Sequence, residues 1–155
     1  MSDFRFAAIT GKDSAGVIAL WRTCGLTRPW NDPAADISFA LSRPNATILA
    51  GRDGAGTIVA TVMVGHDGHR GWVYYLATDP AFRRRGFGRR AMGQAEAWLR
   101  ARGVWKLNIL VRNGNADVLA FYRDCGFDDD DCAVLSRRLD GRAHRQPLPG
   151  ADDWR

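Results

Sequence analysis

Two runs of β-branched residues, ATILAGR and TIVATVMVGH, are separated only by the tetrapeptide DGAG. Asp-Gly followed by a second glycine supplies the positive φ angles of a tight turn, so we predict that the runs pair as an antiparallel hairpin. The turn-forming segment HDGHRG and a third strand-like run, WVYYLAT, follow directly. This pattern predicts a three-stranded antiparallel meander in the middle of the chain, over residues 46–78.

Helical patterns stand on both sides of this meander. Thr10 and Asp13 have capping-box spacing before an apolar stripe of helical period over residues 17–24. A second short helix is predicted around residues 34–41, and a longer one over residues 88–102, where Gly103 ends the pattern.

The remaining segments complete a mixed order of strands and helices. FRFAAI, WKLNILV and CAVLSRRL are predicted strands, and ADVLAFYRDC is a predicted helix. The order β-α-α-β-β-β-α-β-α-β predicts one mixed α/β domain. We expect this domain to cover residues 1–139, whereas residues 140–155 are polar, contain two prolines and are predicted to form a disordered tail.

Composition excludes several classes of protein. No run of about 18 or more apolar residues is present, and the segment MSDFRFAAIT lacks a hydrophobic signal, so we predict a cytoplasmic protein that does not bind membranes. The three cysteines lack C-x-x-C spacing, and the three histidines do not cluster with them. We therefore expect reduced cysteines and no metal site.

The stretch RRRGFGRR, residues 83–90, holds five arginines, and the rest of the chain is balanced at 17 basic and 17 acidic side chains. It lies between a predicted strand end and a predicted helix start, where unpaired backbone N–H groups bind anions. Glycines let the backbone approach a bulky oxyanion, and arginines add forked hydrogen bonds. The stretch therefore suits a phosphate or pyrophosphate, although a solvated basic turn has the same composition. It matches neither the P-loop nor the G-x-G-x-x-G pattern.

Two separated motifs resemble signatures of the GNAT superfamily of acetyltransferases. YYLATDPAFRRRGFGRRAM resembles its acyl-CoA-binding motif, and NADVLAFYRDCGF resembles its second signature. The residues at the defining positions are Arg83, Gly86, Gly88, Asn115, Tyr122, Gly126 and Phe127. The resemblance covers residues 4–139, and the segments LWRTCGLTRPWNDP and GHDGHRGWVYYLA are similar to a small bacterial subgroup of the family whose acceptors are undefined.

The resemblance implies a GNAT-type central mixed β-sheet of about six strands, with an antiparallel meander and about four flanking helices. It also implies that acetyl-CoA lies between the WVYYLAT and WKLNILV strands. Backbone groups of the first strand would hold the pantetheine, and amides of the arginine-glycine stretch would hold the pyrophosphate. The residues implied in cofactor binding are Leu76, Ala77, Thr78, Arg83, Arg84, Arg85, Gly86, Phe87, Gly88, Arg89 and Asn115.

By the same resemblance Tyr122 protonates the leaving sulfur, although its place on an apolar helix face also suits a core tyrosine. The base is less defined, because Leu110 stands where family members that acetylate ribosomal proteins and N-termini carry a glutamate. A water relay from Tyr74 or Tyr75, direct action of Asp32, or an acceptor amine of low pKa are the alternatives.

The proline-rich loop GLTRPWNDP is expected, by analogy with the family, to form one wall of the acceptor site. Arg28 could pair with an acceptor carboxylate, and Trp30 could form a flat apolar wall or a packing anchor. Asp32 and Tyr74 complete the predicted acceptor residues. We interpret His66, His69 and the DDDD run at residues 128–131 as solvated, although the acidic run could attract a cationic acceptor.

The resulting hypothesis is an enzyme that moves an acetyl group from acetyl-CoA to a primary amine of a small molecule or peptide. Transfer would occur by direct attack in a ternary complex, since no cysteine has a histidine beside it in the sequence. A homodimer is possible. A degenerate CoA-binding module is the alternative, whereas nucleic acid is disfavoured because the chain outside residues 83–90 is neutral.

Overall fold

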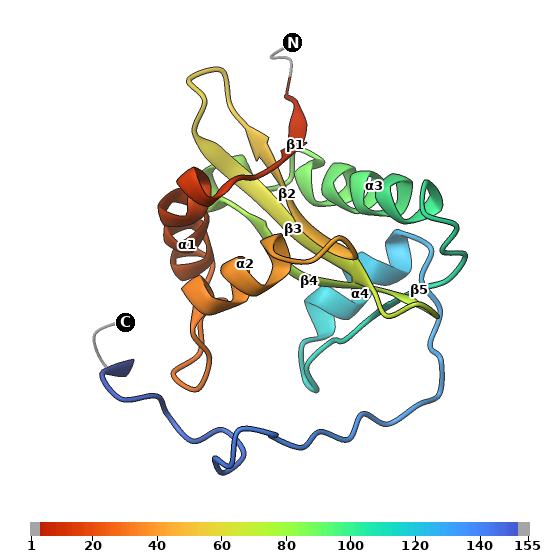
Figure 1. Cartoon of the computed structure of the whole chain (residues 1–155). Helices are drawn as coiled ribbons and strands as arrows, with labels where there is room; N and C mark the ends of the chain where they lie inside the picture. Colours follow the sequence, from red (N-terminus) through yellow and green to blue (C-terminus); the bar gives the residue numbers. More distant parts are fainter. Residues whose placement is uncertain (1–3, 152–155) are drawn as a thin grey trace.

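The computed structural model describes residues 4–151, which form a single five-stranded sheet with helices on both faces (Figure 1). The strands follow one another in chain order, and β1 to β4 pair antiparallel whereas β5 lies parallel to β4. The strands are β1 (Phe6–Ala8), β2 (Ala46–Arg52), β3 (Ile58–His66), β4 (Gly71–Thr78) and β5 (Leu107–Ile109). The predicted meander is therefore confirmed as β2, β3 and β4.

Four α-helices cover the sheet in two layers (Figure 1). One layer and its core lie on the first face of the sheet, and the other layer packs on the opposite face. The first layer holds α1 (Ser14–Thr23) and α2 (Pro33–Leu41), and the second holds α3 (Phe87–Arg100) and α4 (Ala116–Asp124). Short 3-10 helices precede α1 (η1, Gly11–Asp13) and α3 (η2, Pro80–Phe82).

Successive side chains of the central strand β3 pack alternately into the two cores. Val62 and Val64 are fully buried against α3, whereas Met63 packs against the core beneath α1 and α2. This alternation follows from the period of two in a strand that is covered on both faces.

The starts of η1, which leads into α1, and of α2 are set by short-range hydrogen bonds. The backbone N–H of Thr10 donates to Asp13 Oδ2 at 2.9 Å, which confirms the predicted capping box. At α2, Pro33 occupies the first turn, and Asp32 Oδ1 accepts from the backbone N–H groups of Ala34 (2.9 Å) and Ala35 (3.2 Å).

The strand predicted at CAVLSRRL is wrong in the described chain: residues 132–139 form no ladder pair with β5 or any other strand. Val134, Leu135 and Leu139 are 61%, 94% and 94% exposed. A β-branched run becomes a strand only where a partner edge accepts its backbone, and this run follows a path away from the sheet (Figure 1). The mixed α/β class is confirmed, with five strands against about six expected.

From residue 138 onward the chain runs back toward the loop between α1 and α2 (Figure 1). The Arg138 guanidinium donates to the Trp30 carbonyl at 3.3 Å, and the Leu148 backbone N–H donates to the Pro29 carbonyl at 2.6 Å. The division into a domain of residues 1–139 and a disordered tail stays a prediction. No helix of the described residues is long and apolar enough to cross a membrane.

Candidate active site

The parallel strands β4 and β5 are joined over only part of their length. Their ladder pairs are Gly71 with Leu107, Trp72 with Asn108 and Val73 with Ile109. Beyond Val73, β4 continues to Thr78 with β3 as its ladder partner. The segment expected to hold pantetheine, Leu76 to Thr78, therefore lies on the part of β4 that β5 leaves unpaired.

The same part of β4 contains a β-bulge. Thr61 of β3 pairs with Ala77 and Met63 pairs with Tyr74, so Tyr75 and Leu76 share the space opposite a single β3 residue. Tyr75 has a φ of 52°, a left-handed conformation that costs energy for a residue with a large side chain.

Side chains from two other elements hold this bulge. The Thr61 hydroxyl is fully buried, accepts a hydrogen bond from Trp21 Nε1 at 2.9 Å and donates one to the Tyr75 carbonyl at 3.0 Å. The Trp21 and Tyr75 rings stack with centroids 3.7 Å apart and planes 7° from parallel. The unusual backbone of Tyr75 is thus fixed by α1 and β3 together.

A polar cluster on the α2 side surrounds the Tyr75 hydroxyl. This hydroxyl donates to Asp36 Oδ2 at 2.6 Å and accepts from Asn31 Nδ2 at 2.9 Å, and the same Nδ2 also donates to Asp36 Oδ2. Burial and the neighbouring Asp36 carboxylate raise the pKa of Tyr75 far above its usual range, so its hydroxyl stays protonated. Sequence reasoning missed Asp36; its position four residues after Asp32 in NDPAAD was the available signal.

The arginine-glycine stretch forms the start of α3. Gly86 is the N-cap residue with a φ of 79°, and no side chain caps the helix at this position. Arg83, Arg84 and Arg85 are exposed and make no ion pair with another described residue. The first turn of α3 therefore offers backbone N–H groups and positive charge at one point.

The two glycines of this motif serve different purposes. A Cβ on Gly86 would meet nothing within 4 Å, so its left-handed φ is what requires glycine. A Cβ on Gly88 would lie 3.2 Å from the Phe121 ring, so this glycine lets α4 approach the start of α3.

Two arginines in the first turn of α3 donate hydrogen bonds to backbone carbonyls of other segments. Arg89 donates to the Asp124 carbonyl at the end of α4 (3.1 Å), and Arg90 donates to the Phe4 carbonyl (2.9 Å). The buried Phe87 ring packs edge-on against Phe4 at a centroid distance of 4.4 Å.

Tyr122 lies on α4 in the same core cluster as Leu76 of the β4 bulge. Its ring makes edge contacts with Phe121 and Phe127 at centroid distances of 5.1 and 5.7 Å. Burial, and to a smaller extent Cys125, raises the pKa of Tyr122 to about 12. Its hydroxyl bonds to no described residue and is not sealed from solvent, so it is a protonated donor without an internal acceptor.

Asn115, the other predicted residue of this motif, is the N-cap of α4. Its side chain is exposed and makes no capping hydrogen bond. The side-chain amide makes no hydrogen bond with another described residue, so its binding role stays a prediction.

The predicted acceptor residues take different roles. Arg28 donates to the carbonyls of Gly25 (2.7 Å) and Thr27 (2.8 Å) and thereby folds its own loop. The Trp30 ring lies 5.6 Å from the Arg145 guanidinium. The Asp32 carboxylate caps α2. Tyr74 is 46% exposed, and its pKa is raised by partial burial and by Asp67.

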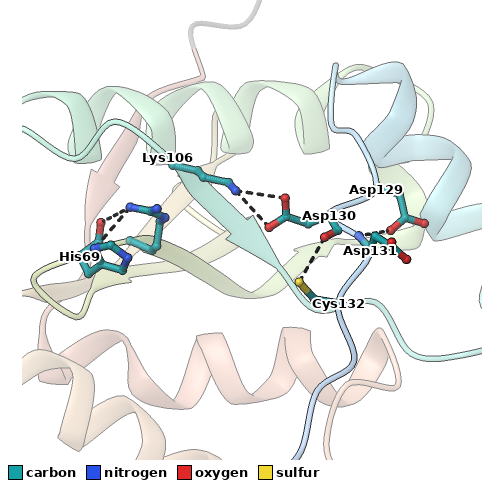
Figure 2. Close-up of polar contacts among 7 residues, drawn as sticks. His69, Lys106, Asp129, Asp130, Asp131 and Cys132 are labelled. Carbon is teal, nitrogen blue, oxygen red and sulfur yellow. Dashed lines mark hydrogen bonds and ion pairs between the residues drawn. The ribbon is translucent and has the colours of Figure 1, made fainter.

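The acidic run at residues 128–131 lies beside the start of β5, where Figure 2 shows Lys106 reaching the Asp130 carboxylate. The two Lys106–Asp130 contacts measure 3.0 and 3.1 Å, and the Asp131 backbone N–H donates to Asp129 Oδ1 at 2.9 Å. Both partners of the ion pair are solvated, so it contributes little to stability.

Two other possible sites in the described chain do not fit the expected chemistry. A hollow of about 440 Å³ between α1 and α2 is lined by residues such as Ala34, Ile37 and Leu41 and contains no titratable side chain. No group of three or more His, Cys, Asp or Glu side chains between residues 4 and 151 is arranged to hold a metal ion.

Comparison with known proteins identifies the family. The chain matches the acetyltransferase (GNAT) family over residues 15–127. An acetyltransferase of Yersinia enterocolitica is 43% identical over 127 residues, which cover 82% of this chain and 89% of the relative. An acetyltransferase of Pectobacterium atrosepticum is 41% identical over 128 residues with the same coverages. The chain therefore belongs to the GNAT family of acetyltransferases, which confirms the predicted family, whereas membership of the bacterial subgroup stays a prediction.

Solved structures of low sequence identity have the same fold. A putative acetyltransferase from Agrobacterium tumefaciens has a TM-score of 0.72 at 23% identity, covering 86% of this chain and 99% of its own. The aminoglycoside N-acetyltransferase AAC(6')-Iy in complex with CoA has a TM-score of 0.77 at 13% identity, covering 90% and 97%.

Proposed function

We propose that this acetyltransferase moves the acetyl group of acetyl-CoA to a primary amine of a small molecule or peptide. The observation that carries the proposal concerns the order of two features along the chain. The part of β4 that lacks β5 as a partner is followed, after η2, by the start of α3, which no side chain caps. A backbone edge for the pantetheine and an anion site for the pyrophosphate thus follow each other along one segment.

In this proposal the residues divide the chemistry between them. Backbone groups of Leu76 to Thr78 hold the pantetheine and polarise the thioester carbonyl, while amides of residues 84–89 hold the pyrophosphate. The Asn115 amide binds the pantetheine arm. Tyr122, held protonated by its raised pKa, gives a proton to the departing sulfur.

The acceptor amine attacks while both substrates are bound, so no acyl-enzyme forms. Burial raises the pKa of both Cys24 and Cys125, which keeps each thiol protonated and poorly nucleophilic. The CoA complexes of AAC(6')-Iy, a protein of the same fold, support the choice of acetyl-CoA as donor.

A pair of glycine substitutions tests the pyrophosphate site. Gly86 and Gly103 lie at the two ends of α3, have φ angles of 79° and 76°, and have open space where a Cβ would stand. Valine strains both positions alike, but only Gly86→Val disturbs the proposed anion site. Acetyl-CoA should raise the melting temperature of wild type and of Gly103→Val, and Gly86→Val should lose that shift. Equal shifts in the two variants would contradict the assignment.

Activity is measured as thiol release from acetyl-CoA with a panel of amines, namely 1,5-diaminopentane, L-lysine, neamine and a lysine-containing peptide. Amine-dependent release by the wild type supports the proposal. Binding of acetyl-CoA without release for any amine would instead assign the protein as a CoA-binding module.

A further inference from the structure

The unpaired part of β4 presents different chemistry on its two faces. Leu76 points into the core cluster of α3 and α4, which contains Tyr122. Tyr75, its neighbour in the bulge, packs into the opposite cluster beneath α1 and α2 and bonds to Asp36. A proton donor and a carboxylate therefore lie on opposite sides of the strand that is proposed to hold the thioester.

We propose that Asp36 is the group that receives the acceptor's ammonium and takes its proton, with Asn31 and Tyr75 as positioning residues. This inference rests on the proposed acetyl transfer and adds the base that the sequence does not supply. The acceptor class that it selects is a cationic primary amine.

The hydrogen bonds around Asp36 leave one carboxylate oxygen for a ligand. Asn31 and Tyr75 both bond to Oδ2, and Oδ1 accepts no hydrogen bond from the described residues. Asp36 is also partly exposed, so an amine can reach it. Because Tyr75 is fixed by Trp21 and Thr61, the carboxylate is held in one orientation against the bulge.

The other carboxylates at this part of the molecule bond to helix starts and not to the bulge. Asp32 accepts from two backbone N–H groups at the start of α2. Asp79, directly after β4, accepts from the Ala81 backbone N–H at 2.8 Å and caps η2. Leu110 is half-exposed and supplies no titratable group. Asp36 is thus the carboxylate that is hydrogen-bonded to the bulged Tyr75 and keeps its other oxygen available.

The charged and titratable neighbours of Asp36 come from four elements. Tyr75 belongs to β4, Asp32 is the N-cap residue of α2, and Arg28 lies in the loop between α1 and α2, close enough to act on Tyr75. Cys24, at the end of α1, donates its Sγ–H to the Thr78 carbonyl at 3.3 Å.

The proton balance of the transfer is complete. The ammonium loses one proton to Asp36, the neutral nitrogen attacks the thioester carbonyl carbon, and the carbon–sulfur bond breaks. Tyr122 protonates the sulfur and recovers a proton from the nitrogen, which becomes an amide. Asp36 then releases its proton to solvent. An alkylamine with a pKa of about 10.4 is neutral in roughly one molecule in 10³ to 10⁴ at pH 7, so the first step limits the uncatalysed reaction.

Asp36→Asn tests the inference with two amines of different basicity. The first is 1,5-diaminopentane, which is protonated at pH 7, and the second is methoxyamine, which is not. We expect kcat/KM for 1,5-diaminopentane to fall by about 100-fold or more at pH 7, with the loss shrinking toward pH 10. Transfer to methoxyamine and the acetyl-CoA-induced thermal shift should be retained, which shows that the variant is folded.

Tyr75→Phe should give a smaller loss with a displaced pH profile, because it frees the carboxylate without removing it. Asp124→Asn, which changes an exposed carboxylate at the end of α4, is the matched control and should leave both reactions unchanged. Equal losses with both amines would make Asp36 structural, and an unchanged pH profile would also overturn the inference. Absence of transfer by the wild type with every amine would instead overturn the proposed function.

Discussion

Tyr122 illustrates how one side chain can meet two requirements. Its ring packs between Phe121 and Phe127 as a core residue would, while its hydroxyl remains without a partner in the described chain. The interpretations of this residue as core and as proton donor are therefore compatible. The edge contacts fix the ring, and a fixed ring is what a directed proton transfer needs.

We predict that Tyr122→Phe lowers turnover by about 10-fold or more, because the departing thiolate loses its proton donor. Acetyl-CoA affinity should change little, since the phenol contributes to the reaction rather than to binding. With a pKa of about 12, the hydroxyl stays protonated up to alkaline pH, so wild-type activity should show no loss from this group below about pH 10. Steady-state kinetics and calorimetry measure both quantities. Equal turnover in the two proteins would leave Tyr122 with the packing role alone.

At the scale of the elements, one buried hydroxyl, that of Thr61, holds the bulge between β3 and β4 in place. Thr61 joins Trp21 of α1 to the Tyr75 carbonyl, so a helix, a strand and the bulge share a single side chain. Without this bridge the indole N–H and the bulged carbonyl would both be buried without partners.

We predict that Thr61→Val lowers the free energy of unfolding by about 1–3 kcal/mol, which is the cost of leaving a buried polar group unsatisfied. Urea unfolding monitored by tryptophan fluorescence measures this value. Thr47→Val in β2 is the control, because the Thr47 hydroxyl bonds to no described residue, and its effect should stay within about 0.5 kcal/mol. Similar values for the two variants would show that the bridge does not stabilise the bulge.

The two aspartates at the start of α2 show how the tertiary contacts of a residue decide its role. Asp32 and Asp36 are equivalent in type and lie one turn apart, yet the first caps the helix and the second reaches β4. The cap follows from Pro33 and local geometry, whereas the contact with Tyr75 needs the helix to be docked on the sheet.

At the scale of the whole molecule, the net charge of +5 equals the five arginines of residues 83–90. The structure divides this group. Arg89 and Arg90 bond to backbone carbonyls, and the exposed Arg83, Arg84 and Arg85 precede the proposed anion site. In the proposed function these last three are the arginines that would contact the phosphates of acetyl-CoA.

We predict that acetyl-CoA binding weakens several-fold when KCl is raised from about 50 to about 500 mM, because salt screens exposed charges. Dephospho-CoA, which lacks the ribose phosphate, should show a smaller change. Calorimetric titrations of both ligands over this range make the comparison. An affinity independent of salt would contradict a role for the exposed arginines.

The sequence by itself determined the order of the elements as far as α4, the meander, the capping box and the start of α3. Each of these depends on local information: a period of two or 3.6, a capping side chain, or a glycine such as Gly86 whose φ is positive. The motifs around Arg83 and Tyr122 were also sufficient to predict the family.

Only the tertiary structure decided which segments meet. Gly88 leaves room for the Phe121 ring, and Asp36 accepts a hydrogen bond from Tyr75. Trp21 and Thr61 hold the bulge of β4 in place. None of these contacts produces a periodic pattern in the sequence, because each joins residues that are distant in the chain. For the same reason CAVLSRRL was predicted as a strand from its composition, although strand formation depends on an edge that only the folded sheet can offer.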